Sequence, residues 1–311
     1  MKTLSLVVPC YNEQETIKPF MAAMKQVEKS MSQKLLFDYL FVDDGSRDQT
    51  LAVLKQITND KANVNYLAFS RNFGKEAALL AGLEHARGDL IVVMDVDLQD
   101  PPELIPDMFQ KIEEGYDVVA TRRKDRKGEP PIRSFFSKLF YKLINMTSDT
   151  DMVDGARDYR MMTRQVVNSI LKMREINRFS KGLFAWVGYD VYYMSFDNRE
   201  RVAGETSWSF WGLLKYSIEG FVNFSEILLS LATMSGFLSF IASLIGICIV
   251  IIRKIIIGGS VSGWASLVCI ILFMGGLQLL AIGILGKYIS KIFLETKKRP
   301  HYIVKEGNLD V

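Results

Sequence analysis

The sequence predicts an α/β protein in which a mostly parallel sheet, covered by helices on both faces, is followed by a hairpin of two transmembrane helices. Three observations lead to this prediction. Short apolar runs alternate with helical patterns, polar clusters follow those runs, and two long uncharged segments lie toward the end of the 311 residues. Buried apolar strands that alternate with helices are typical of parallel sheets.

The alternation is clearest in the first 121 residues. Strands are expected at residues 4–9, 39–42, 64–69, 90–94 and 118–121, and helices at about residues 15–31, 49–59, 75–86 and 103–113. In sheets of this kind ligands bind beyond the carboxyl ends of the strands. The polar residues that follow the strands should therefore meet at one edge and form a single site from four loops. These polar residues are Asn12-Glu13, Asp43-Asp44, Arg71 and Asp95-Asp97.

Two segments near the C-terminal end carry no charged residue. They cover residues 227–252 and 255–286, and only Arg253 and Lys254 separate them. A helix needs roughly 20 apolar residues to cross a bilayer, and soluble core helices rarely run so long without a charge. The sequence thus predicts transmembrane helices at about residues 227–252 and 264–287.

Basic residues predict the orientation of this hairpin. Six of them follow the second span: Lys287, Lys291, Lys297, Lys298, Arg299 and Lys305. The positive-inside rule therefore puts both termini in the cytoplasm, with residues 290–311 as a basic tail. The first apolar run is too short for a signal peptide. Residues 1–205 are accordingly expected to form a cytoplasmic domain of a protein of the cell membrane.

Two further segments combine aromatic residues with lysines. One is a helical pattern at about residues 132–146, and the other, at residues 206–226, directly precedes the first span. This composition is typical of helices that lie in the membrane interface. The alternative, that these helices pack on the soluble core, stays open for both.

Composition excludes several kinds of chemistry. There are only two histidines, His85 and His301, and the three cysteines show no metal-ligand spacing. Disulfides, a zinc site and histidine-based triads are therefore not expected. The net charge of +3 gives no indication of a nucleic-acid partner. Any reaction must depend on carboxylates, arginines and a metal ion.

Asp95 and Asp97 form the clearest candidate metal site. Two carboxylates one residue apart at the end of a strand can share a hard divalent cation, Mg²⁺ or Mn²⁺, and leave positions open for phosphate oxygens. Gln99 could add a neutral oxygen ligand. An isolated Asp-x-Asp is weak, but the string that continues to Glu103, DVDLQDPPE, is much more specific.

Three motifs carry a resemblance to a known family. Residues 7–13 (VVPCYNE), 42–46 (VDDGS) and 95–103 (DVDLQDPPE) resemble the signatures of family-2 glycosyltransferases, which have the GT-A fold. The chain is similar to the polyisoprenyl-phosphate branch, which includes dolichol-phosphate mannose synthases and bacterial undecaprenyl-phosphate glucosyltransferases. Bacterial members also carry two C-terminal spans, so the resemblance covers essentially the whole chain.

The resemblance implies roles for individual residues on the donor side. Nucleotide binding would fall to Pro9, Tyr11, Glu13 and Asp44, with further contacts from Arg71, Lys75 and Asp95. Metal binding would fall to Asp95, Asp97 and Gln99, and Asp97 would thereby take part in catalysis.

On the acceptor side, the resemblance implies that arginines bind phosphate. Arg122, Arg133 and Ser137 would grip the lipid phosphate, and Arg201 would close over the diphosphate. Arg133 and Ser137 are spaced to share one face of a helix. A merely solvated charged surface remains the alternative reading for these arginines.

The catalytic carboxylate is expected in residues 154–160 (DGARDYR). The family pattern is one residue shorter, and its Asp-aromatic-Arg part matches Asp158 to Arg160, so Asp158 is assigned and Asp154 remains the alternative. A phosphate monoester is already mostly ionised at neutral pH, since its second pKa is about 6. A strong general base is therefore not required, and Asp158 is expected to orient the phosphate or the sugar.

Together these observations predict an inverting transferase. It would move a hexose from UDP-glucose or UDP-N-acetylglucosamine to polyprenyl phosphate and form a β-linked lipid-phosphate sugar. A homo-oligomer, a tetramer by analogy, and a separate flippase are expected as partners. Two alternatives are a processive polysaccharide synthase, which would need more spans and a Gln-x-x-Arg-Trp motif, and a non-catalytic membrane scaffold.

Overall fold

The computed structural model describes residues 1–123, 145, 153–197, 227–257 and 263–309. The chain divides into two compact units, one of Met1–Ser217 with Arg299–Val311 and the other of Ile218–Lys298. The interfacial helices predicted at residues 132–146 and 206–226 lie outside the described residues, apart from residue 145.

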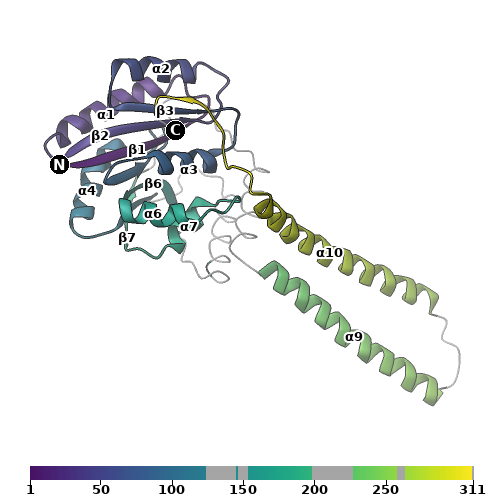
Figure 1. Ribbon diagram of the computed structural model, residues 1–311. Coiled ribbons are helices and arrows are strands. Elements are labelled where there is room, and N and C mark those ends of the chain that lie inside the picture. The colour runs from purple at the N-terminus through teal and green to yellow at the C-terminus, as the bar shows by residue number, and fades with distance from the viewer. Residues whose placement is uncertain (124–144, 146–152, 198–226, 258–262, 310–311) are drawn as a thin grey trace. The chain divides into compact units, whose positions relative to one another are not determined.

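The first unit is built on a mixed sheet (Figure 1). Its strand order in the described part of the chain is β7-β5-β6-β4-β1-β2-β3-β8. The strands are β1 (Lys2–Cys10), β2 (Leu35–Asp43), β3 (Val64–Phe69), β4 (Leu90–Val93), β5 (Val118–Arg123), β6 (Ala156–Thr163), β7 (Val191–Phe196) and β8 (Val304–Gly307). β1 to β4 pair in parallel, so their carboxyl ends share one edge.

Helices cover both faces of this sheet. The side chains of α1 (Ile17–Met31), α2 (Thr50–Asp60) and α4 (Ile105–Glu113) pack on one face, with the short helix η1 (Pro102–Leu104) before α4. Those of α3 (Lys75–His85), α6 (Arg164–Lys172) and α7 (Ser180–Trp186) pack on the other.

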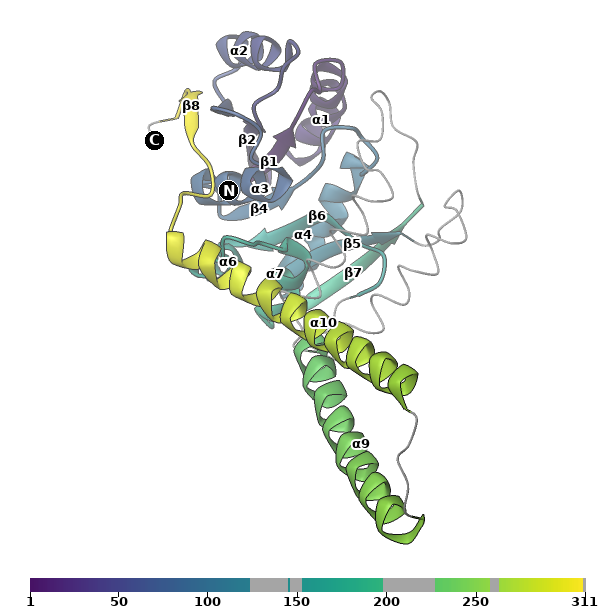
Figure 2. The ribbon, with the colours of Figure 1, turned by 90° about the vertical axis from the view of Figure 1, so that its right-hand side faces the viewer.

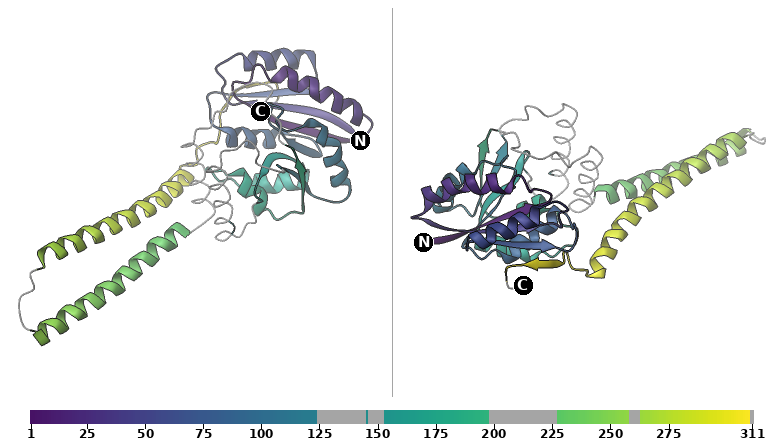
Figure 3. Two further views of the ribbon diagram at one scale, coloured as in Figure 1. Left: turned by 180° about the vertical axis from the view of Figure 1, so that it is seen from behind. Right: turned by 90° about the horizontal axis from the view of Figure 1, so that it is seen from above.

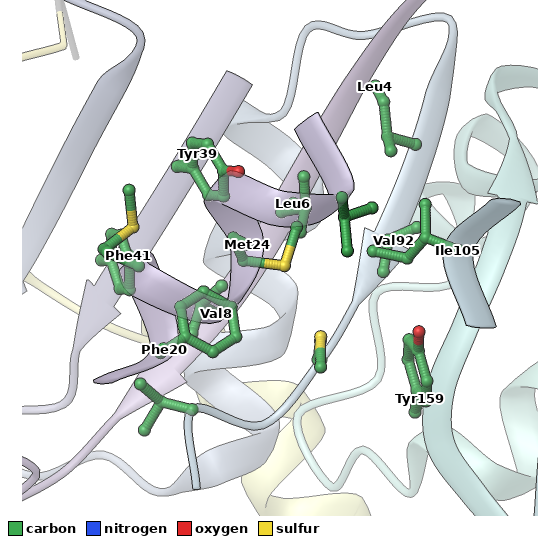
Figure 4. Close-up of a cluster of buried hydrophobic side chains, with 14 of the residues drawn as sticks. Leu4, Leu6, Val8, Phe20, Met24, Tyr39, Phe41, Val92, Ile105 and Tyr159 are labelled. Carbon is green, nitrogen blue, oxygen red and sulfur yellow. The ribbon is translucent and has the colours of Figure 1, made fainter. Parts of the chain in front are cut away.

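Alternation along the strands divides the core between the two faces. Leu4, Leu6 and Val8 of β1 join Phe20 and Met24 of α1 in one cluster (Figure 4). Val7, between them in sequence, belongs to the cluster under α3 and α6. Successive strand residues point to opposite faces, so a near-continuous apolar run is what a strand buried on both sides requires.

The predicted α/β class is confirmed, and so are the five strands and four helices expected from the sequence. Three strands were not predicted. β6 lies antiparallel between β4 and β5, and β7 pairs in parallel with β5. Residues 156–160, expected as a site segment of unspecified structure, therefore begin a central strand.

The third unpredicted strand is β8, which lies in the segment expected to be a basic tail. The last long helix runs on to Lys297, and β8 then pairs antiparallel with β3 at the edge of the sheet (Figure 2). The side chain of Asn308 supports this pairing, since its Oδ1 accepts a hydrogen bond from the N–H of Tyr66 at 2.7 Å.

The second unit consists of α9 (Ile227–Ile257) and α10 (Trp264–Lys297), which lie side by side (Figure 3). With 31 residues, α9 is about 46 Å long at 1.5 Å per residue, longer than the roughly 30 Å hydrocarbon core of a bilayer. By length and composition both helices could cross a membrane, and the segments that meet this criterion are Leu229–Gly246 and Phe273–Lys297.

Candidate active site

The loops that follow β1 and β2 are joined by side chain–backbone hydrogen bonds. The N–H of Asn12 donates to Ser46 Oγ at 2.9 Å, and Asn12 Oδ1 accepts from the N–H of Arg47 at 2.9 Å. Asn12 itself has a positive φ of 55°, which asparagine tolerates better than most residues. These hydrogen bonds hold the two loops together at the carboxyl edge of the sheet.

The first motif places Pro9, Tyr11 and Glu13 at this edge of the sheet. Pro9 is on β1 opposite Val42 of β2, and Tyr11 is 40% exposed at the edge. The N–H of Glu13 donates to Thr50 Oγ1 at 2.8 Å, and its carboxylate accepts from the Thr16 hydroxyl at 2.9 Å. All three predicted nucleotide residues therefore lie at the predicted edge.

Asp44 connects the second motif to the loop between β3 and α3. Its carboxylate is only 4% exposed and accepts hydrogen bonds from the N–H of Phe73 at 2.7 Å and of Gly74 at 2.9 Å. Burial raises the pKa of Asp44 to about 6, although these backbone hydrogen bonds oppose the shift. The side chain predicted to bind the nucleoside thus also fixes the neighbouring loop.

Gly45 is required by this arrangement. It has a φ of +66°, and a Cβ there would lie 2.3 Å from the carbonyl carbon of Arg71. Only glycine combines that backbone conformation with such a close approach. The second motif therefore packs backbone to backbone against the third loop.

Arg71 is placed by an aromatic ring in that loop. Its guanidinium carbon lies 4.1 Å from the centre of the Phe73 ring, a cation–π contact. Arg71 Nη1 also donates to the carbonyl of Asn72 at 3.1 Å. The residue remains exposed at the edge of the sheet, next to Asp44.

Lys75, in the first turn of α3, joins carboxylates from two different strands. Its Nζ lies 2.8 Å from Asp95 Oδ1 and 2.8 Å from Asp158 Oδ2. Asp95 follows β4, whereas Asp158 is on β6. Lys75 was predicted to contact the nucleotide alone. In the structure it connects the predicted metal ligand with the predicted catalytic carboxylate.

These contacts set the ionisation of Asp158. Burial by itself pushes the pKa of Asp158 up, but the charge and hydrogen bond of Lys75, with the charges of Lys181 and Arg160, hold it below the ordinary value. Asp158 is therefore a carboxylate at neutral pH. The alternative candidate, Asp154, is exposed in the turn before β6 and comes before Gly155, whose φ is 79°.

Asp95, Asp97 and Gln99 follow β4 as predicted. Asp97 is 5% exposed, and its Oδ1 accepts from the N–H of Gln99 at 3.1 Å. Leu98 between them has a φ of 57°, a conformation that costs roughly 1–2 kcal/mol for a residue with a branched side chain. The turn bends sharply around the carboxylate of Asp97.

The chemistry of this set suits a hard cation. Among the described residues there is no group of three or more His, Cys, Asp or Glu placed to hold a metal ion. Mg²⁺ is commonly held by one or two carboxylates, with substrate phosphates and water completing its shell, so a three-ligand protein cage is not needed. Asp95 and Asp97 provide such carboxylates.

A buried ion pair that was not predicted from the sequence supports this turn. Asp100, 1% exposed, accepts from Arg157 Nε at 3.0 Å, and the Tyr159 hydroxyl donates to the carbonyl of Pro101 at 3.1 Å. Burial raises the pKa of Asp100 to about 6 despite the charge of Arg157. The two partners are 57 residues apart, so no local pattern could have revealed the pair.

Arg160 is another buried cation near Asp158. It is 6% exposed, its guanidinium carbon lies 3.7 Å from the centre of the Phe184 ring, and its Nη2 donates to the carbonyl of Arg157 at 2.8 Å. Burial lowers the pKa of Arg160 to about 10, so it remains charged at neutral pH.

The predicted phosphate-binding residues are only partly described. Arg122 is exposed at the end of β5, where its Nε donates to Ser195 Oγ of β7 at 2.9 Å. Arg133, Ser137 and Arg201 lie outside the described residues. The structure thus brings the donor-side residues and Asp158 to one edge of the sheet, and leaves most of the acceptor side as a prediction.

Comparison with known proteins identifies the family of this chain. The family model described as Glycosyl transferase family 2 matches residues 5–171. CsbB of Bacillus subtilis (strain 168), a protein described as a glycosyltransferase, is 42% identical over 98% of this chain and 92% of its own length.

Two further relatives have similar coverage. The prophage bactoprenol glucosyl transferase homolog of Escherichia coli (strain K12) is 40% identical over 97% of this chain and 98% of its own length. The bactoprenol glucosyl transferase of Shigella phage SfX is 39% identical over the same shares. A solved mannosyltransferase of Pyrobaculum calidifontis, in complex with GDP-Man and Mn²⁺, is 14% identical over 93% of this chain and 87% of that chain, with a TM-score of 0.48.

The family model spans more than half of the chain, and relatives near 40% identity span nearly all of it. The chain therefore belongs to glycosyltransferase family 2.

Proposed function

We propose that this enzyme transfers glucose from UDP-glucose to the phosphate of a polyprenyl lipid. The observation that carries the proposal is the contact of Lys75 with both Asp95 and Asp158, which joins a candidate metal ligand to a carboxylate held ionised. The acceptor class and the sugar are suggested by the relatives named as bactoprenol glucosyl transferases.

The proposed reaction is a single in-line displacement that inverts the anomeric carbon. An oxygen of the lipid phosphate forms a bond to the anomeric carbon. The bond between that carbon and the β-phosphate oxygen of UDP breaks at the same time, and UDP leaves with the electron pair. The lipid phosphate is already largely ionised near neutral pH, because its second pKa is about 6. The product is a β-linked glucosyl phosphate on the lipid.

Residues of the chain would contribute mainly position and charge. Asp44, Tyr11 and Glu13 would bind the nucleoside, with Arg71 beside them, and Asp158 would orient the acceptor or the sugar. Lys75 would keep Asp158 ionised and in place. Electrostatic preorganisation of this kind is often the largest single contribution to an enzymatic rate.

A divalent cation, Mg²⁺ or Mn²⁺, is proposed at Asp95 and Asp97, with Gln99 as a further oxygen ligand. When bound, it would offset the charge that develops on the leaving diphosphate. On the acceptor side, Arg122, Arg133 and Ser137 would hold the lipid phosphate, and Arg201 the diphosphate.

The two apolar helices would anchor the enzyme in the membrane from which its acceptor comes. We propose that both termini and the sheet face the cytoplasm, because the basic residues cluster after the second apolar segment. A homotetramer and a separate flippase for the product remain further proposals. The UDP-N-acetylglucosamine alternative also stays a proposal that only assay can decide.

A radiolabelled-donor assay tests the proposal. Membranes with the enzyme and added polyprenyl phosphate would receive UDP-glucose, UDP-N-acetylglucosamine or GDP-mannose, each with and without EDTA. Label in an extractable lipid phosphate from UDP-glucose, lost with EDTA and with Asp97→Asn, is expected. Asp60→Asn, at the exposed end of α2, serves as the matched control and should match the unmodified enzyme.

Other outcomes of the same assay would overturn it. Label in a polymer would indicate a processive synthase, and absence of transfer from every donor would favour a non-catalytic scaffold. Full activity in excess EDTA would remove the metal from the proposal.

A further inference from the structure

Residues 301–308, directly after α10, are bonded to the strand that leads into the donor site. β8 pairs with β3, and the N–H of Ser70 donates to the carbonyl of Ile303 at 2.9 Å. Ser70 is the residue before Arg71, so the backbone that enters the proposed nucleotide loop has its hydrogen-bond partner in this C-terminal segment.

A row of aromatic rings continues this contact into the loop. Tyr302 stacks on Phe69, with ring centres 4.9 Å apart and planes at 16°. Phe69, only 2% exposed, forms a T-shaped pair with Phe73, with ring centres 5.8 Å apart and planes at 90°. Arg71 then lies over Phe73 at 4.1 Å. Tyr302 is thus linked to a proposed nucleotide ligand through two intervening rings.

Phe73, the last ring of this row, is also hydrogen-bonded to Asp44, the other proposed nucleotide ligand. The N–H of Phe73 donates to Asp44, so the ring and backbone of this residue serve Arg71 and Asp44 at once. The near end is fixed as well, because the Tyr302 hydroxyl is hydrogen-bonded to Glu84 of α3. Stacked and edge-on aromatic pairs have preferred geometries, so displacing one ring shifts its neighbours.

We propose that Tyr302 is a positioning residue for the nucleotide of the donor, acting through Phe69 and Phe73 on Arg71 and Asp44. This rests on the proposed function, since it takes Arg71 and Asp44 as nucleotide ligands. Its consequence is that donor affinity depends on a residue that follows the apolar hairpin in sequence, more than 230 positions after Phe69. Arg122, proposed to bind the acceptor, lies at the end of β5 and is hydrogen-bonded to Ser195 of β7.

The test uses the full-length enzyme in detergent and measures UDP binding by calorimetry, together with donor KM, lipid KM and kcat. Tyr302→Ala is expected to raise the Kd for UDP and the donor KM by about three- to tenfold, the range expected for loss of an aromatic pair. The kcat at saturating donor and the lipid KM should stay within about twofold. Tyr302→Phe keeps the ring, loses the hydroxyl, and should retain donor affinity.

Glu306→Gln is the matched control. It lies on β8 and removes the exposed ion pair with Lys55 at 2.5 Å, without touching the aromatic row. It should leave UDP affinity unchanged. Equal loss of affinity in Glu306→Gln and Tyr302→Ala would mean that the strand acts only as general support, and would overturn the proposed role of Tyr302.

Remaining outcomes are also decisive. If Tyr302→Ala lowers kcat and leaves donor KM unchanged, the residue affects only the folded fraction and the inference fails. If Tyr302→Phe behaves like Tyr302→Ala, the hydroxyl and not the stacking matters, and the inference fails too. If the unmodified enzyme transfers glucose but binds UDP no differently from Tyr302→Ala, the inference fails alone. An unmodified enzyme that neither binds UDP nor transfers glucose refutes the proposed function itself.

Discussion

The two sides of the site hold their carboxylates in different ways. Asp44, on the proposed donor side, is held by neutral backbone N–H groups of Phe73 and Gly74. Asp158, on the proposed reaction side, is held by the ammonium of Lys75, which also contacts Asp95. Burial dominates at Asp44 and raises its pKa to about 6, whereas charge prevails at Asp158 and lowers its pKa.

This difference separates two tasks. Backbone hydrogen bonds fix a carboxylate in one place together with the loops that it joins. An ion pair with a long, flexible lysine that is 37% exposed can exchange partners when another charged group enters. The donor side is therefore built as a rigid frame, and the reaction side as a set of exchangeable charges.

The largest expected effect tests the reaction side. Asp158→Asn removes a charge but keeps the shape of the side chain, and should lower kcat by about 100- to 1,000-fold, the range seen when a preorganised electrostatic contact is lost. The Kd for UDP should change by less than about threefold. Initial rates with labelled donor and calorimetric titration measure the two quantities.

Asp154→Asn is the control for this prediction, because Asp154 is exposed in the turn before β6. It should retain most activity. If Asp154→Asn were the more damaging substitution, Asp154 and not Asp158 would be the acceptor-side carboxylate. The contrast between Asp44 and Asp158 would then no longer describe the two sides of the site.

A smaller effect is expected at Asp44. Asp44→Ala removes hydrogen bonds from a charged acceptor, which typically costs about 1.5–3 kcal/mol, or roughly ten- to more than a hundredfold in binding. The Kd for UDP should rise by that factor, and the melting temperature should fall as well, because the loop before α3 loses its anchor. Asp158→Asn should not lower the melting temperature to the same extent, and an equal fall would contradict the division between frame and exchangeable charge.

Gly45 tests how tightly the loop after β2 is packed against the loop that contains Arg71. Gly45→Ala must accommodate both a positive φ and a Cβ 2.3 Å from the backbone of Arg71, whereas Gly115→Ala meets only a positive φ, with no atom within 4 Å. The backbone conformation alone costs roughly 1–2 kcal/mol. Chemical denaturation should therefore show a larger loss of unfolding free energy for Gly45→Ala. Equal losses would mean that the second and third loops can separate without cost.

The smallest effect is a dependence of stability on pH. The pKa of Asp44 is about 6 in the folded protein against 3.8 ordinarily. Between these values the folded state binds more protons than the unfolded state, so the unfolding free energy should fall as pH rises from about 4 to about 6. The lowered pKa of Asp158 acts in the opposite sense, but only below its ordinary value of 3.8.

Thermal unfolding at several pH values in this range would measure the trend. Asp44→Asn should make it shallower without abolishing it, because Asp100 also has a pKa raised to about 6 by burial. A slope identical to that of the unmodified protein would show that Asp44 does not titrate as its burial implies.

What the sequence could predict is mostly local. Asp44 directly follows β2 and Asp97 lies four residues after the end of β4, and the parallel pairing of β1 to β4 brings such positions to one edge. The loop motifs therefore predicted, without any knowledge of contacts, which residues lie together at this edge. Long uncharged runs likewise predicted the two long helices.

What could not be predicted depends on pairing between distant segments. Asp158 is 83 positions after Lys75, and they meet only because β6 inserts antiparallel between β4 and β5. The charges of residues 290–311 suggested a solvated tail. They gave no sign that four of its residues would pair with β3, since that depends on an edge which exists only in the folded sheet.

The position of β8 at the end of the chain has a consequence for biosynthesis. Residues 304–307 leave the ribosome only after both apolar helices have been made, yet they pair with a strand that was completed near residue 69. Until then the outer edge of β3 has no strand beside it, and Ser70 has no partner in Ile303. Contacts over such a separation form late and slowly. The sheet therefore cannot be completed at this edge until both apolar helices have been synthesised, and the loop after β3 gains its last backbone partner only then.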